Sequence, residues 1–238
     1  MKRNIWKKWI ILGIGISMFI LTATQSCFAA TIGSLNRRIE RAKTYLEDIN
    51  AAPDRGIPES LLSDCKGIVF MRMYNAGFIF GLKGGYGIVL VKNPKTQQWS
   101  APAFLKYAGA SFGAQIGVQK TDAIFLIMNR EGINMLMKTK FTIGVDASAA
   151  AGPVGRNFAG SIGPGTSILV YSRSKWAYAG ATFSGAAFIN DDEANHEFYH
   201  NDTITTQDIL FKNAVPVPSL AIPLIKDIEK YSVIYKTQ

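Results

Sequence analysis

The chain has 238 residues, of which 48% are hydrophobic and 18% are charged. This composition supports a buried core and argues against an intrinsically disordered chain, and 22 glycines with 9 prolines are too few for a low-complexity or collagen-like polymer. Lysine and arginine exceed the acidic residues by 26 to 17, an excess that suggests a nucleic-acid-binding protein until the position of the charges is considered.

The first 29 residues have the order of charge and hydrophobicity that is typical of a secretory signal peptide. Four basic residues precede an apolar run from Trp9 to Ala23, and small residues then lead to Ala30. The run would span about 22 Å as a helix, which is shorter than a hydrocarbon core of ~30 Å. We expect cleavage before Ala30 and export to the periplasm or the medium, with residues 30–238 as the mature domain.

Cys27 offers a second cleavage site, because the signal peptidase of lipoproteins cuts before a cysteine that is then acylated. Ser26 fits this site, whereas Thr24 and Gln25 fit it poorly. Simple cleavage is therefore favoured, and membrane anchoring through an acylated Cys27 stays open as the alternative. In either case, the protein is exported.

Loss of the signal peptide changes the charge balance of the chain. Residues 1–29 hold four basic and no acidic residues, so the mature chain keeps a net charge of plus five. The nucleic-acid interpretation therefore loses most of its support, and we expect no nucleic-acid partner. Cys65 is the only cysteine after residue 29, so no intramolecular disulfide is expected in that chain.

Residues 34–50 are predicted to form an amphipathic helix, because apolar side chains recur at steps of three and four from Leu35 to Ile49. In one interpretation this stripe packs on the domain. In the other, the stripe inserts partly into a bilayer while the cations beside it contact lipid phosphates. These flanking cations are Arg37, Arg38, Arg41 and Lys43.

After Gly67 the sequence changes to short runs rich in Val, Ile, Phe and Tyr that are separated by glycines, which is typical of β-sheet. Three hairpins are predicted, with turns at Gly84-Gly85, at residues 120–122 and at residues 172–175. Short helices are predicted near residues 57–62, 130–138 and 191–199, and two more within residues 205–231. The expected fold is α+β, with an antiparallel, Gly- and Ala-rich β-sheet core flanked by an N-terminal amphipathic helix and C-terminal helices.

His196, Glu197 and His200 match the HExxH motif of zinc-dependent hydrolases. A third ligand in a recognisable second motif is missing from the sequence, and the histidines fall near the predicted end of a short helix. The glycine-rich segments also lack the strand-to-helix setting of a nucleotide-binding loop. We therefore expect a non-enzymatic protein without a metal or cofactor, and keep a zinc-dependent hydrolase as the less favoured alternative.

Short motifs in a fixed order extend over about residues 35–231. They are Ile57-Pro58, Leu61-Leu62, Lys66-Gly67-Ile68, Gly81 with Gly84, Gly85 and Gly87, Trp99-Ser100-Ala101-Pro102, Gly113-Ala114-Gln115-Ile116-Gly117, Gly152-Pro153-Val154-Gly155-Arg156, Tyr171-Ser172-Arg173-Ser174-Lys175, Ala179-Gly180, and Asn195 with Tyr199. In this order and spacing they resemble the SYLF-domain family, a lipid-binding module found in exported bacterial proteins and in eukaryotic endocytic proteins.

The resemblance implies binding and not catalysis. Eukaryotic members bind phosphoinositides and, in yeast, actin filaments, with an amphipathic N-terminal helix and basic residues implicated. For this chain the resemblance implies peripheral binding of anionic lipid head groups, phospholipid or phosphoinositide-like, with partial insertion of the helix. The alternative is a structural envelope or protein-interaction module, with a protein partner and a permanently docked helix. The candidate lipid contacts are Arg37, Arg38, Arg41 and Lys43, with Lys66 and Arg72 as further candidates.

Overall fold

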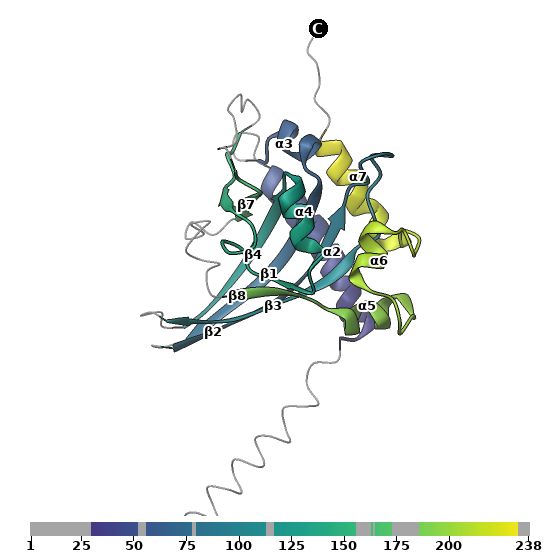
Figure 1. Cartoon of the computed structure of the whole chain (residues 1–238). Helices are drawn as coiled ribbons and strands as arrows, with labels where there is room; N and C mark the ends of the chain where they lie inside the picture. Colours follow the sequence, from purple (N-terminus) through teal and green to yellow (C-terminus); the bar gives the residue numbers. More distant parts are fainter. Residues whose placement is uncertain are drawn as a thin grey trace, which may run out of the picture. The chain divides into compact units, whose positions relative to one another are not determined.

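An eight-stranded sheet organises the chain from Ile32 onward, with the strand order β5-β8-β3-β2-β1-β4-β7-β6 (Figure 1). Neighbouring strands are antiparallel, except that β6 and β7 run parallel. The strands are β1 Gly67–Gly77, β2 Phe80–Val91, β3 Ala103–Phe112, β4 Gly117–Ile127, β5 Lys140–Phe141, β6 Ala149–Ala151, β7 Ile168–Ser172 and β8 Ala186–Asn190.

The computed structural model describes residues 30–51, 56–77, 80–112, 117–155, 163, 165–172 and 186–232. The expected signal peptide, the cleavage sites at Cys27 and Ala30 and the predicted turn at residues 172–175 therefore lie wholly or mostly outside the described residues. Within the described ranges, no helix combines the length and the apolar content that crossing a bilayer requires.

Helices lie on both faces of the sheet (Figure 1). The long helix α2 crosses one face, and α4 and α6 contribute to the hydrophobic cluster on the other. The helices are α2 Ile32–Asn50, α3 Glu59–Asp64, α4 Arg130–Leu136, α5 Asp192–Tyr199, α6 Thr206–Phe211 and α7 Ile222–Tyr231, with a 3-10 turn, η1, at Ser219–Ala221. The expected α+β fold, with its N-terminal and C-terminal helices, is confirmed.

Alternation along the strands divides the buried side chains between the two faces. Met71 and Phe125 belong to the cluster that includes side chains of α4 and α6. Phe70 and Ile88, one residue out of phase with that set, are buried on the face that carries α2. Both faces of the central strands are therefore covered in this part of the sheet.

Helix α2 buries its apolar stripe against the rest of the domain, where its neighbours are β2, α5, η1 and α7. Leu35, Ile39 and Leu46 have no exposed surface, and Ile49 is half-buried. Burying such a side chain contributes about 1.5–3 kcal/mol, which the helix would lose on leaving the sheet. The interpretation that this stripe inserts into a bilayer is therefore wrong for the folded domain, and the interpretation of a helix packed on the domain holds.

The first predicted hairpin is wrong, because Gly84 and Gly85 lie inside the continuous strand β2 and not in a turn. Strand β2 pairs along its length with β1, and the glycines allow close approach of the two backbones. A Cβ atom on Gly87 would lie 2.0 Å from the carbonyl oxygen of Phe70, whereas one on Gly84 would meet nothing within 4 Å. Glycine at position 87 therefore reflects crowding between strands, not a turn.

The second predicted turn, at residues 120–122, is also wrong, because it lies inside strand β4. Asp122 is held in that strand opposite Arg72, to which it is bound. Of the third predicted pair, the described strands β7 and β8 are not neighbours: β7 pairs with β4 and β6, and β8 pairs with β3 and β5. Local sequence identified these strands, but their partners are set by contacts distant in sequence.

The short helices after the sheet strands form where predicted, and side-chain caps explain their starts. Asp191 accepts a hydrogen bond from the backbone of Ala194 at the start of α5. Thr205 and Asp208 form the expected capping box at the start of α6. Hydrogen bonds from Lys212 and Thr205 lower the pKa of the Asp208 carboxyl to about 2. These local contacts fix where α5 and α6 begin, and Ile209 and Leu210 of α6 then pack into the hydrophobic cluster on the sheet.

Candidate functional site: an arginine cluster between helix α2 and the sheet

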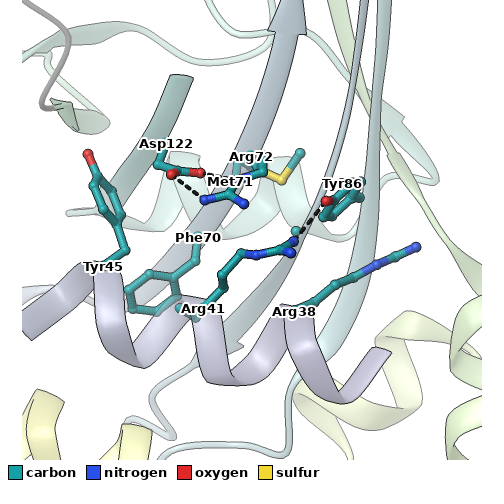
Figure 2. Close-up of a pocket in the computed structure, with 10 residues that line it drawn as sticks. Arg38, Arg41, Tyr45, Phe70, Met71, Arg72, Tyr86 and Asp122 are labelled. Atoms are coloured by element: carbon teal, nitrogen blue, oxygen red, sulfur yellow. Dashed lines mark hydrogen bonds and ion pairs between the residues drawn. The ribbon is translucent and has the colours of Figure 1, made fainter. Parts of the chain in front are cut away.

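Three of the six predicted lipid contacts meet at one narrow cleft. Arg38 and Arg41 project from the same side of α2, and Arg72 projects from β1 toward them (Figure 2). We call these three residues the arginine cluster. The enclosed volume is about 20 Å³, room for about one water molecule, so a larger anion would bind at the mouth of the cleft and not within it.

Arg72 is held by a carboxylate on the neighbouring strand. Its Nε and Nη2 atoms each donate to Asp122 at 2.6 Å, one to each carboxylate oxygen (Figure 2). This two-bond geometry fits the planar guanidinium and fixes the side chain. The hydrogen bonds with Asp122 raise the pKa of Arg72. The charge of Arg72 is therefore fixed in place and largely compensated.

The charge of Arg38 is compensated by a buried carboxylate that lies 153 positions later in the sequence. Its Nη1 lies 3.0 Å from Oδ2 of Asp191, whose side chain is 1% exposed. The other carboxylate oxygen of Asp191 lies 2.9 Å from Nζ of Lys106. The Arg38 guanidinium also lies 4.8 Å from the centre of the Tyr86 ring, which adds a cation–π contact. One carboxylate thus faces two cations.

Arg41 differs from the other two arginines in its partner. Its Nη1 donates to the hydroxyl of Tyr86 at 2.8 Å, which is a neutral acceptor (Figure 2). Within the described part of the chain, no carboxylate lies within ion-pair distance of Arg41. Arg38 and Lys106 share Asp191, and Lys106 also lies 3.4 Å from Glu193. The excess of positive charge on this face therefore comes from Arg41.

The pKa of Tyr86 shows the effect of the positive charge of Arg41. Its hydroxyl lies 3.3 Å from that of Tyr74. Burial raises the pKa of Tyr86, but the hydrogen bond with Tyr74 and the positive charge of Arg41 outweigh it, so the net pKa is lowered. Burial and the bond to Tyr86 raise the pKa of Tyr74.

The remaining predicted contacts lie away from the cleft or are engaged elsewhere. Lys43 pairs with Glu47 at 2.6 Å and with Asp227 of α7 at 3.4 Å, so it joins two helices. Arg37 is exposed on α2, and Lys66 is exposed between α3 and β1. The structure therefore does not bring these three cations into the arginine cluster.

Two residues of the site were missed from the sequence, namely Tyr86 and Asp122. Both lie directly opposite Arg72 on the strands that flank it. The sequence places them in predicted strands or turns, but only the strand register brings them to one row. A correct prediction of the register of β1 with β2 and β4 would have identified both residues.

The HExxH segment has a different geometry from a zinc site. His200 is the residue that ends α5, in a left-handed conformation with φ of 51°. The ring Nε2 of His196 lies 3.0 Å from the carbonyl oxygen of Ile204. This nitrogen therefore already has a backbone partner. Among the described residues, no group of three His, Cys, Asp or Glu side chains is placed to hold a metal ion.

Comparison with known proteins shows the family. A family model described as "Ysc84: Las17-binding protein actin regulator" matches residues 108–231, slightly more than half of the chain. Protein YSC84 of Saccharomyces cerevisiae is 34% identical over 74% of this chain and 38% of its own length. The SH3 domain-containing YSC84-like protein 1 of Rattus norvegicus is 32% identical over 78% of this chain and 55% of its own.

LAS seventeen-binding protein 3 of S. cerevisiae is 31% identical over 77% of this chain and 40% of its own length. The chain thus spans about half or less of the length of these curated relatives. Their names describe binding and SH3-containing proteins and no enzyme. No solved structure gives a significant match. On the family model and these relatives, the chain belongs to the Ysc84 family, the family of the SYLF domain.

Proposed function

We propose that this chain is a non-enzymatic protein that binds anionic lipid head groups through the arginine cluster, with helix α2 docked on the sheet. The observation that carries the proposal is Arg41, a half-buried cation whose described partner is the neutral Tyr86 hydroxyl. The proposal places the mature protein, from Ala30 on, outside the cytoplasm, where it meets the surface of an anionic membrane.

The chemistry of a lipid phosphate fits this site. A phosphate accepts two hydrogen bonds from one guanidinium, and arginine is better suited to this geometry than lysine. Each cation near an anionic surface contributes about 1 kcal/mol of attraction. Because these contacts are at the protein surface, salt weakens them.

Exchange of Arg41 for glutamine tests the proposal. We expect Arg41→Gln to weaken binding to vesicles that contain phosphatidylglycerol by about fivefold, as the loss of about 1 kcal/mol implies, and to leave the fold intact. Co-sedimentation with anionic and neutral vesicles at two salt concentrations measures this effect. The control is Arg130→Gln, the same charge change on an exposed residue of α4, across the sheet from α2.

Equal binding of the unchanged protein to anionic and neutral vesicles would contradict the proposal, as would equal losses in the two variants. Either result would favour the second candidate, a protein-interaction module. The docked helix α2, the description of the family as Las17-binding proteins and the name of LAS seventeen-binding protein 3 favour that candidate. In that case the arginine cluster would meet an acidic surface of a protein partner.

A further inference from the structure

The sheet extends beyond helix α2, and its α2 face continues there as three rows of side chains. The row nearest α2 contains Arg72, with Tyr86 and Asp122 beside it. The next row holds Tyr74 between Gly84 and Lys120. The third row lies close to the end of the strands and consists of Ala110, Leu82, Ala76 and Val118, on β3, β2, β1 and β4.

This third row, the strand-end patch, is apolar and faces solvent. Leu82 is 75% exposed and Val118 is 76% exposed. They flank the exposed Ala76 from the two neighbouring strands, which places them about 10 Å apart on the same face. Exposed aliphatic side chains that adjoin one another in this way mark a surface that a partner or a membrane covers.

The sequence of rows matches the layers of a membrane interface. Rows on one face of a strand are about 7 Å apart, so the strand-end patch lies about 14 Å from the row of Arg72. The head-group layer of one leaflet is about 5–8 Å thick. With the strand-end patch at the acyl boundary, Tyr74 and Lys120 reach the head groups. Strands tilted about 60° from the bilayer normal then bring the row of Arg72 to about 7 Å above that boundary, at the outer edge of the head groups.

The chemistry of each row also fits its layer. Tyrosine is enriched where one end of the ring is apolar and the other is hydrated, as at a membrane interface. Lys120 is exposed in the row of Tyr74. In the three rows the one described acid is Asp122, and it is bound to Arg72. The face therefore offers no acidic side chain that would repel anionic lipid.

We propose that the strand-end patch inserts into the interfacial layer of an anionic bilayer, and that the sheet, not helix α2, supplies the apolar anchor of this protein. This inference rests on the proposed function, because the arginine cluster provides the attraction that brings the patch to the membrane. Charge draws the protein to the surface, and Leu82 and Val118 then hold it there.

A paired serine exchange tests the anchor. We expect Leu82→Ser with Val118→Ser to weaken partitioning onto phosphatidylglycerol-containing vesicles by tenfold or more at moderate salt, and to lower the pressure up to which the protein inserts into a monolayer of the same lipid. The matched control exchanges two exposed residues elsewhere, Met137→Ser with Val145→Ser. Because all four side chains are exposed, circular dichroism should show both variants folded.

A second measurement introduces a fluorescent tryptophan instead of removing apolar side chains. Lipids with brominated acyl chains should quench the fluorescence of the tryptophan that Val118→Trp introduces. The same lipids should not quench the fluorescence of the tryptophan that Val145→Trp introduces.

If the unchanged protein fails to bind anionic vesicles, the proposed function itself is contradicted. If it binds but the serine variant inserts equally well and the added tryptophan is not quenched, this inference alone is overturned. Conversion of a dimer to a monomer by the serine variant, without loss of insertion, would assign the patch to a second copy and would also overturn it.

Discussion

Replacing Asp191 with alanine is expected to lower the free energy of unfolding by about 3–5 kcal/mol. The carboxylate is 1% exposed and lies between Arg38 of α2 and Lys106 of β3. Its removal leaves the Arg38 guanidinium, with 11% of its side chain exposed, without its compensating charge. Urea denaturation at neutral pH measures the loss.

Two further variants separate the contributions of Asp191. Asp191→Asn keeps an acceptor for the backbone of Ala194 at the start of α5, so it should lose about 1 kcal/mol less than the alanine variant. Glu47→Ala removes an exposed partner of Lys43 and should cost less than about 1 kcal/mol. A cost for Asp191→Ala no greater than that for Glu47→Ala would contradict the role of Asp191 as the tie between α2 and the sheet.

Truncating Ile39 to alanine should lower the free energy of unfolding by about 2–5 kcal/mol. Ile39 has no exposed surface, and it belongs to the apolar stripe that α2 buries in the domain. The exchange leaves a cavity that the surrounding strands fill only in part. Thermal or urea denaturation measures the effect, with Arg37→Ala, an exposed position of the same helix, as the control that should change stability by less than about 0.5 kcal/mol.

The Ile39 variant also separates the two interpretations of α2. If the stripe were a membrane anchor, Ile39→Ala would weaken vesicle binding and leave the stability of the free protein unchanged. The packed helix predicts the reverse: a less stable domain whose folded fraction binds vesicles as well as the unchanged protein does. A stability within about 0.5 kcal/mol of the unchanged protein would contradict the packing described for α2.

Helices were predictable from this sequence because their determinants are local. The spacing of Leu35, Ile39 and Leu46 defines α2, and Thr205 with Asp208 defines the start of α6. Strand pairing was not predictable in the same way. Gly84-Gly85 resembles a turn, but both residues lie inside β2. Close approach to the backbone of β1 accounts for glycine at position 85, and that approach depends on residues outside the local segment.

The site shows the same division between local and distant determinants. Arg38 and Arg41 are three positions apart on a helix, so the sequence alone puts them on one side of it. That Arg72 joins them follows from the crossing of α2 over β1, and Tyr86 and Asp122 follow from the register of β1 with β2 and β4. The buried partner Asp191 is 153 positions from Arg38, and nothing in the local sequence pairs the two.

Methyl NMR of the labelled protein on anionic lipid discs, with a spin label in the lipid acyl chains, tests most directly which surface enters the membrane. We expect the label to broaden the methyl signals of Leu82 and Val118 and to leave those of Leu35, Ile39 and Leu46 sharp. Broadening of the α2 methyl signals, with Leu82 and Val118 unaffected, would show that the helix leaves the domain to enter the bilayer and would contradict insertion through the sheet.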